Sequence, residues 1–435
     1  MLICTGLAKH CALIVGLLVL QPMVCLGADH AELPIASGDP IPGTTKKIAS
    51  VSSVYVDGDR LVFEGSNDDG AGYGVVVKKA GVWQLDGWVD TSTLVLKKKS
   101  SLSGKKLVFI ASDAIGDQGI FGVADVTAAD NLPIQILGAG ETLPGVSPSN
   151  TFQVADIVDV ELVGSSLVAN IKKASSGRPA GEGLYHLPNF PTTTGMELIL
   201  GTAQLTELGY IGDIYDFSHN GKKAIVSMEG DFGPVIFVTE DLGRSPALTL
   251  VADTATAIPF SDENFSNFGN VQLRKKAAFE GRNGVISGIY YTTDPGVERL
   301  RRIVDTTMDV PGLVGKKFTR FDGISVDQSR FLFVGETSDG GRSVFSGLES
   351  IGGGTAKREI FVGMDVGHKI LETIHFNRKS LGSVLVASQF DDGSSGVVLA
   401  ESSIGVPSFP GFAMLMLMVV ALLATGFAAT IEQQA

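Results

Sequence analysis

A two-strand signature recurs seven times along this 435-residue chain, and this repetition constrains the fold more than any single motif. The first strand of each pair ends in an apolar run, and a linker rich in Asp, Gly and Ser follows it. Because Gly supplies the positive φ that tight turns need, these linkers predict hairpins. The seven pairs begin at Arg60 and Gly74, Lys106 and Gly119, Ser166 and Gly183, Lys223 and Val235, Lys276 and Gly288, Arg330 and Ser343, and Ser383 and Gly396.

A second recurring stretch lies between the pairs: a short apolar strand, an Ala/Gly/Asp-rich bend, and an apolar–Pro stop. It reads LTLVADTATAIP at Leu248–Pro259, and copies end at Gly43, Gly145 and Gly312. Another short strand precedes several of the pairs, so one unit holds four strands over about 50 residues, the size of one propeller blade. The repeat therefore predicts an all-β, seven-bladed β-propeller over residues 29–403.

The two ends of the repeat region predict how the ring closes. The seventh unit, Ile370–Ser402, has three strand candidates and lacks the Pro-ended fourth, whereas Glu32–Pro42 is a Pro-ended strand with no unit before it. We therefore expect the N-terminal strand to complete the last blade, which would remove the free strand edges of the ring. An open β-solenoid, two separate sandwiches, and rings of six or eight blades are the alternatives.

Residues 1–28 have the organisation of a secretory signal peptide. Lys9 provides a positive charge, Cys11–Leu20 is apolar, and Gly27 or Ala28 offers a small residue for cleavage. An N-terminal membrane anchor and a lipoprotein are the alternatives. All three cysteines lie in the first 25 residues, so removal of this segment would leave a chain without thiols.

Residues 404–435 predict a Pro-containing linker, a transmembrane helix and a short tail. Phe412–Ala429 contains no charged residue. At ~1.5 Å per residue this run spans roughly 27 Å, enough to cross the apolar core of a bilayer. A buried core helix is seldom apolar on every face, so we expect a membrane anchor with the propeller outside the cytoplasm.

Two of the Pro-ended stretches, Val251–Pro259 (VADTATAIP) and Val304–Pro311 (VDTTMDVP), resemble a segment of a bacterial family of exported tandem-repeat proteins with variable anchors. Asn220, Gly221 and Ala224 are the nearest match to the NxxGxxAF-like motif of that family. The stretch VPSFPGFAM resembles the sorting tails of the PEP-CTERM and IPTL-CTERM kind, although the basic cluster that ends such tails is missing. The resemblance implies a propeller-like fold and an exported location. It does not imply any particular activity.

Charge and motifs exclude several classes of function. The net charge of −13 argues against nucleic acid, whose phosphates need a basic face. The sequence contains no HExxH, GxSxG or Walker A motif, so no catalytic or cofactor-binding residue is predicted. Five histidines lie beyond the signal segment, and none has metal-ligand spacing, so we expect surface or edge histidines. They are His30, His186, His219, His368 and His375.

Acidic turns are the candidate metal sites of the sequence. Asp68 with Asp69, and Asp391 with Asp392, could bind Ca²⁺ through their carboxylates. Calcium takes about six to eight oxygen ligands, so a pair of adjacent carboxylates would need help from another loop. A solvated acidic turn is the alternative.

Taken together, these features predict a membrane-anchored propeller that acts as a binding or scaffold module at the cell envelope, with a protein or glycan partner. A propeller hydrolase or lyase acting on envelope glycans, and a structural surface component, are the alternatives. Propeller enzymes assemble their sites from several blades, so about three or more carboxylates, Arg or His at the axis would favour the enzyme. An apolar or neutral funnel would count against it.

Overall fold

The computed structural model describes residues 31–400 with short gaps. The predicted signal peptide (1–28) and the predicted transmembrane helix (412–429) lie outside the described residues. No helix among the described residues has the length and the apolar character that crossing a membrane requires. The gaps are 58–59, 81, 129, 146–150, 176–177, 193, 203–204, 207–208, 245, 298, 328–329, 349–354, 367–368 and 377–383.

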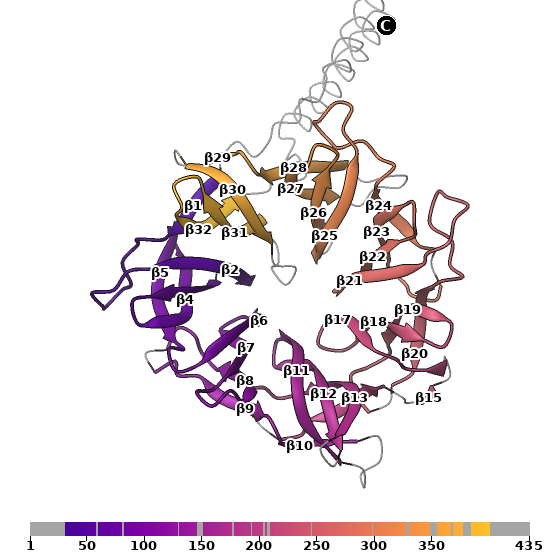
Figure 1. Ribbon diagram of the computed structural model, residues 1–435, viewed down its shortest axis with the longest axis horizontal. Coiled ribbons are helices and arrows are strands. Elements are labelled where there is room, and N and C mark those ends of the chain that lie inside the picture. Colours follow the sequence, from indigo (N-terminus) through magenta and orange to yellow (C-terminus); the bar gives the residue numbers. More distant parts are fainter. Residues whose placement is uncertain are drawn as a thin grey trace, which may run out of the picture. The chain divides into compact units, whose positions relative to one another are not determined.

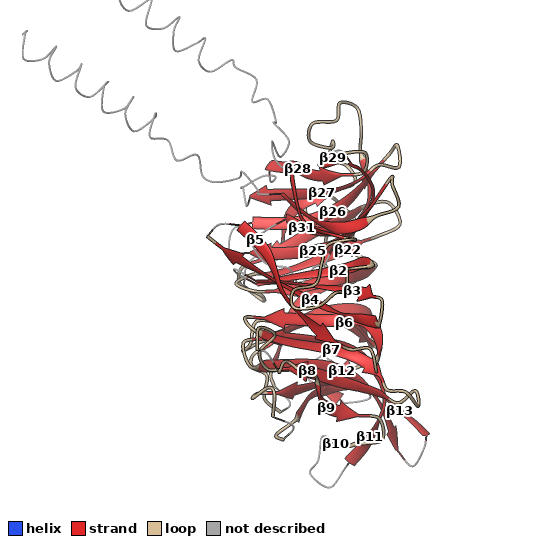
Figure 2. Ribbon diagram, turned by 90° about the vertical axis from the view of Figure 1, so that its left-hand side faces the viewer, coloured by secondary structure: helices blue, strands red, loops and turns tan. Residues whose placement is uncertain are grey.

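Seven antiparallel sheets surround a central axis as the blades of a β-propeller (Figure 1). In Figure 2 the strands run from one face of the ring to the other, and the connecting turns lie at the two faces. In each blade the innermost strand precedes the second and third strands in the chain, and these lie successively farther from the axis. We number the blades 1 to 7 in chain order. The prediction of a seven-bladed propeller is thus confirmed.

The innermost strands face the axis. Two short strands, β10 (Thr142–Pro144) and β29 (Asp365–Val366), pair with two of them, and β15 (Leu205–Thr206) pairs separately with β16 (Gly209–Tyr210). From blade 1 to blade 7 the innermost strands are β2 (Ser50–Asp57), β6 (Val95–Ser103), β11 (Thr151–Val163), β17 (Ile214–His219), β21 (Asn267–Leu273), β25 (Phe318–Asp327) and β30 (Lys369–Phe376).

The repeated sequence pairs form the second and third strands of all seven blades, as predicted. The second strands are β3 (Arg60–Asn67), β7 (Lys106–Ser112), β12 (Ser166–Ser175), β18 (Ala224–Gly230), β22 (Ala277–Arg282), β26 (Arg330–Thr337) and β31 (Val384–Phe390). The third strands are β4 (Gly70–Lys79), β8 (Gln118–Val123), β13 (Arg178–Leu187), β19 (Gly233–Thr239), β23 (Ser287–Thr292), β27 (Arg342–Leu348) and β32 (Ser395–Ala400).

The outermost strand of blade 7 comes from the other end of the chain. Ala31 lies opposite Ala400 and Ala36 lies opposite Gly396, so the N-terminal strand closes the ring as expected. This pairing covers the edge of β32 that would otherwise be free. From blade 1 to blade 7 the outermost strands are β5 (Val82–Asp90), β9 (Ile134–Gly138), β14 (Glu197–Gly201), β20 (Leu248–Asp253), β24 (Arg301–Asp305), β28 (Thr355–Phe361) and β1 (Ala31–Ala36).

Seven hydrophobic clusters form the core, and each one joins two neighbouring blades. The apolar residue of each Pro-ended stretch belongs to one of these clusters: Ile41, Leu143, Ile258 and Val310 are each at most 2% exposed. Burial contributes about 25 cal/mol per Å² of apolar surface, so these residues stabilise the contact between blades. This is why the stretch repeats along the chain.

The bend of the Pro-ended stretch is a side-chain turn. Asp253 Oδ1 accepts hydrogen bonds from the Ala255 N–H over 3.0 Å and from the Thr256 hydroxyl over 2.7 Å. Asp305 accepts the Thr307 N–H in the same way over 2.9 Å. An Asp that bonds the backbone two residues on turns the chain sharply. The turn ends the outermost strand and directs the chain towards the next blade.

A glycine within the third strand of several blades makes room for an aromatic ring. A Cβ on Gly74 would fall inside the ring of Phe63, and a Cβ on Gly183 would lie 2.7 Å from the Tyr185 ring. Phe63 and Tyr185 are both almost fully buried. The repeated Gly therefore reflects close packing of aromatic rings against the backbone of the sheet.

Candidate functional site: a polar cavity that reaches the axis

A cavity of about 480 Å³ gathers side chains from blades 2, 4, 5 and 6. Blade 2 is not adjacent to the other three, so the cavity reaches the central space of the ring. We call it the axial cavity. It lies near the starts of β17 and β25, at the face that carries the connections between blades. Its lining residues are Lys99, Tyr215, Asp216, Gly269, Asn270, Glu280, Arg282, Arg320, Phe321 and Asp322.

Bulges in the innermost strands place several of these side chains. All seven innermost strands shift register against their second strands. The shift falls at Tyr215 in β17, at Asn270 in β21 and within Lys97–Lys99 in β6. A bulge bends its strand and changes the direction of a side chain, which is why bulges are common near functional sites. Here they bring polar groups to the cavity wall.

Glu280 is the carboxyl group whose protonation the cavity alters most clearly. Burial raises its pKa, and the charge of Asp322 adds to that effect, whereas Arg282 opposes it. Asn270 has a φ of 38°, and its Nδ2 donates a hydrogen bond to Glu280 Oε2 over 2.7 Å. Burial therefore disfavours the charged form of Glu280, whereas the hydrogen bond from Asn270 fixes the carboxyl group in place and partly opposes the rise of its pKa.

The other two carboxylates of the cavity have partners within the protein. Asp216 Oδ2 accepts the Val271 N–H over 2.8 Å, and Asp322 Oδ2 accepts Arg342 Nη2 over 2.6 Å. These contacts fix both side chains on the wall of the cavity. A carboxylate that accepts a strong hydrogen bond has less capacity left for a ligand cation.

The three cationic side chains of the cavity differ in whether they have a partner within the protein. Lys99 Nζ lies 3.6 Å from Asp159 Oδ2. Arg282 and Arg320 are exposed, and neither side chain forms an ion pair or a hydrogen bond within the described part of the chain. Two guanidinium groups therefore remain available to a ligand in the cavity.

Tyr215 adds an aromatic surface to the wall. Its side chain is 49% exposed, although its hydroxyl donates a hydrogen bond to Glu229 Oε2. This hydrogen bond raises the pKa of Tyr215 to about 12, so the phenol stays neutral. The same bond restricts the ring to one orientation on the wall of the cavity.

The acidic turns that were predicted to bind calcium lie elsewhere, in blade 1 and blade 7. Asp69 pairs with Lys46, and Asp392 Oδ2 lies 2.9 Å from Lys369 Nζ. The Ser394 hydroxyl and Lys369 lower the pKa of Asp392 to about 2. Among the described residues, no three His, Cys, Asp or Glu side chains are grouped in a way that could hold a metal ion. Calcium binding at Asp68, Asp69, Asp391 and Asp392 stays a prediction.

His219 is not the surface histidine that was expected, because it is fully buried. Its Nε2 lies 3.0 Å from the Glu161 carbonyl, and its Nδ1 lies 3.2 Å from the Gly221 nitrogen. The Gly221 N–H must be the donor, so Nδ1 is unprotonated and Nε2 carries the proton. Burial lowers the pKa of His219 to about 4, which keeps the ring neutral. His30 and His368 lie outside the described residues.

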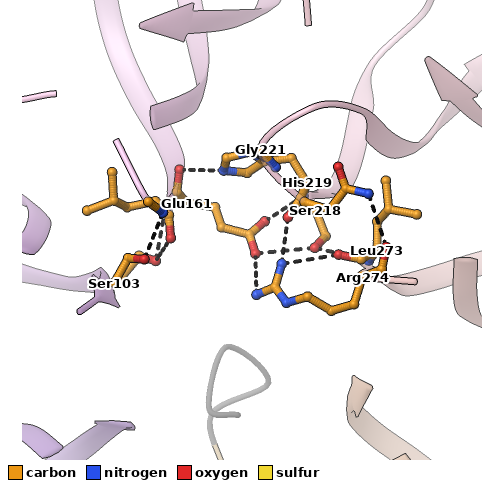
Figure 3. A network of polar contacts seen from close by, with 11 residues as sticks. Ser103, Glu161, Ser218, His219, Gly221, Leu273 and Arg274 are labelled. Atoms are coloured by element: carbon orange, nitrogen blue, oxygen red, sulfur yellow. Dashed lines mark hydrogen bonds and ion pairs between the residues drawn. The ribbon is translucent and has the colours of Figure 1, made fainter. Parts of the chain in front are cut away.

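The carboxylate of Glu161 connects three blades (Figure 3). It accepts the Ser218 hydroxyl over 3.2 Å, the His219 N–H over 3.0 Å, and Arg274 Nη2 over 3.4 Å. Glu161 belongs to blade 3, Ser218 and His219 to blade 4, and Arg274 follows the innermost strand of blade 5. The partners saturate the buried carboxylate, which indicates a role in holding the blades together.

No family model matches this sequence, and no curated protein matches it. Among solved structures, it is similar to the polysaccharide lyase Uly1, with 10% identity, a TM-score of 0.47, and coverage of 86% of this chain and 100% of that one. It is also similar to prolyl oligopeptidase B from Galerina marginata, with 10% identity, a TM-score of 0.46, and coverage of 79% and 47%.

A third similar structure is the β-propeller domain of the Trilobed protease from Pyrococcus furiosus, with 11% identity, a TM-score of 0.35, and coverage of 72% of this chain and 98% of that one. This chain spans about half the length of the oligopeptidase, and 47% of a prolyl endopeptidase that it also resembles. These likenesses concern the arrangement of strands and carry no argument about activity.

The sequence contained a signal for the axial cavity that the motif search missed. Two of the short strands predicted to precede the pairs, FSNFGNVQL from Phe265 and FTRFDGISV from Phe318, carry Asn270, Arg320 and Asp322 among their apolar residues. A Gly inside a strand, such as Gly269 or Gly323 in these stretches, often marks a bulge or the close approach of a ligand. Which of these side chains meet depends on the ring, and their spacing in the sequence does not reveal it.

Proposed function

We propose that this chain is an exported propeller, anchored in a membrane by residues 412–429, that binds a polar ligand in the axial cavity at the cell envelope. The observation that carries the proposal is the convergence of charged side chains from four blades on one cavity of about 480 Å³. Small-molecule sites have volumes of ~300–1,000 Å³, so this cavity has a suitable size. Acidic and basic groups on one wall suit a ligand that is rich in oxygen and nitrogen atoms.

Thermal unfolding of the full-length protein in detergent tests this function with a panel of neutral and acidic oligosaccharides. A ligand that binds only the folded state at ~100 times its dissociation constant adds about 2.7 kcal/mol to stability. We expect at least one sugar to raise the midpoint of the wild type, and Tyr215→Ala to abolish the rise. Phe232→Ala is the control, because Phe232 is 93% exposed in the β18–β19 turn, away from the cavity lining. Equal midpoints with and without every sugar would overturn the proposal.

A second candidate function is the hydrolysis or lytic cleavage of envelope glycans. It is favoured by Glu280, whose pKa is raised by burial. Asp216 and Asp322 line the same cavity. A carboxyl group whose pKa is raised keeps its proton to a higher pH than an ordinary carboxyl group, and it can donate that proton to a leaving group. The wall also meets the criterion of several carboxylate and arginine side chains at the axis, which favours an enzyme over a passive scaffold.

Product analysis separates this candidate from simple binding. A hydrolase releases new reducing ends, and a lyase releases an unsaturated sugar with ultraviolet absorbance. Glu280→Gln should lower turnover about 10²–10⁴-fold, the usual contribution of general acid–base catalysis, and leave binding intact. Glu240→Gln is a matched control on an exposed strand connection, and it should retain full turnover. If the wild type releases neither product from any glycan that binds, the enzymatic function is wrong.

A further inference from the structure

The proposed function does not specify the chemical class of the ligand. The charges of the axial cavity indicate which class it favours. The chain as a whole carries a net charge of −13, so most of its surface repels anions. The cavity differs, because Lys99, Arg282 and Arg320 line it beside three carboxyl groups. Formal charge therefore balances in the cavity, unlike in the rest of the molecule.

The carboxyl groups of the cavity have partners within the protein, whereas two of its cations do not. Asp322 is paired with Arg342, which is outside the lining. Asp216 is held by a backbone N–H, and Glu280 by the amide of Asn270. The charges of Arg282 and Arg320 act on Glu280, but no hydrogen bond or ion pair holds either guanidinium group among the described residues, and both reach the cavity. The groups left without a partner are thus cationic.

Two free guanidinium groups on one wall suit a carboxylate. Arg presents a planar fork of N–H donors that matches the two oxygens of a carboxylate. Arg282 ends β22 in blade 5 and Arg320 lies in β25 in blade 6, so the two groups approach the cavity from neighbouring blades. A carboxylate between them would receive donors from two directions.

The exposed ring of Tyr215 suits the rest of such a ligand. The face of a sugar ring presents C–H groups, and an aromatic ring offers a flat apolar surface for them. The hydrogen bond from the Tyr215 hydroxyl to Glu229 holds the ring in place before a ligand arrives. Such ordering in advance reduces the entropy that binding costs.

We propose that the axial cavity binds an acidic oligosaccharide, with a uronate carboxylate between Arg282 and Arg320 and a sugar ring against Tyr215. This inference rests on the proposed ligand-binding function of the same cavity. It names the class of ligand and the two residues that select it. The carboxylate is the selected group, so a neutral form of the same sugar binds more weakly.

Calorimetric titration of the full-length protein in detergent tests this inference with trigalacturonate and its methyl ester. The two sugars share the same units and linkages, and esterification replaces each charged carboxylate by a neutral methyl ester that is larger by one methyl group. We expect the acid to bind at least about tenfold more tightly than the ester at low salt, and added salt to reduce this preference. An ester that binds as tightly as the acid would overturn the inference and leave the proposed binding function standing.

Substitution of each arginine tests whether Arg282 and Arg320 cause the preference for the acid over the ester. Arg282→Gln and Arg320→Gln should each weaken trigalacturonate binding about tenfold and leave binding of the ester unchanged. Arg299→Gln is the control, because Arg299 is an exposed arginine in the β23–β24 connection, outside the cavity lining. Unchanged binding of the acid by both cavity variants would exclude these arginines. Absence of binding by either sugar and by the whole oligosaccharide panel would instead overturn the proposed function itself.

Discussion

Asn270 Nδ2 donates a hydrogen bond to Glu280 Oε2 over 2.7 Å, from the innermost strand of blade 5 to the second strand of the same blade. The contact depends on a bulge in β21, where Asn270 adopts a φ of 38°. Asn tolerates this left-handed conformation better than most residues. A local irregularity of one strand thereby fixes a partly buried carboxyl group on the wall of the axial cavity.

Glu280→Gln should stabilise the protein at neutral pH. Because the pKa of Glu280 is raised above its ordinary value of 4.5, the folded state binds this proton more tightly than the unfolded state. The contribution of Glu280 is therefore largest below that value and is lost as pH rises through the folded pKa. Urea unfolding at several pH values from acidic to neutral measures this effect. The free energy of unfolding of the variant should rise relative to that of the wild type as pH rises.

Glu240→Gln should change stability at neutral pH in the opposite direction, and it serves as the comparison. A hydrogen bond from Lys223 lowers the pKa of Glu240, so its contribution is present at neutral pH and is lost as pH falls. This variant should be less stable than the wild type at neutral pH. If Glu280→Gln behaves like Glu240→Gln, the carboxyl group of Glu280 is charged in the folded protein and its assignment as a proton donor is wrong.

The blades could be predicted from the sequence because their signals are local. A hairpin such as β22–β23 needs only its own apolar runs and turn, and the missing fourth strand of the last unit indicated the closure by β1. The axial cavity could not be predicted in this way. Lys99, Asp216 and Arg320 come from three blades, and they meet only because the ring brings their strands together. The burial of His219 likewise depends on Glu161 in the preceding blade.

Ile35→Ala should weaken the closure of the ring. Ile35 lies in β1, is 3% exposed, and belongs to the cluster between blades 7 and 1. Removing a buried Ile side chain costs about 2–5 kcal/mol, and we expect a loss in this range in urea unfolding. Val82→Ala is the control, because Val82 is 60% exposed and should cost less than about 0.5 kcal/mol. Equal stability of the two variants would show that β1 contributes little to the closed ring.

Deletion of residues 412–429 should release the protein from membranes. This run contains no charged residue and is long enough to cross a bilayer as a helix. We expect the full-length protein in the membrane pellet and the deletion variant in the soluble fraction after centrifugation. Deletion of the tail Ile431–Ala435 is the control, and it should leave the protein in the pellet. Recovery of the 412–429 deletion in the pellet would show that another part of the chain binds the membrane.

The wild type should lose stability in mildly acidic solution because of His219, and His219→Gln should not show this loss. Burial lowers the pKa of His219 from 6.5 to about 4, so the unfolded state binds this proton more tightly than the folded state. Stability is therefore lost as pH falls from the unfolded value towards the folded one, by an amount that reaches about 3 kcal/mol. Gln can still donate to the Glu161 carbonyl, but it does not titrate. The urea midpoint of the variant should fall less than that of the wild type between about pH 6.5 and pH 4.

The comparison between variant and wild type isolates this histidine from Glu280, whose contribution has the opposite sign and is present in both proteins. His375→Gln is the second control, because His375 is an exposed histidine of blade 7. It should weaken on acidification as the wild type does, since His219 is still present. If His219→Gln and the wild type lose stability in parallel between about pH 6.5 and pH 4, the buried ring is already protonated in the folded protein. In that case Nδ1 would carry a proton and could not accept the Gly221 N–H, so the hydrogen bonds that join blades 3 and 4 at this position would have to be reassigned.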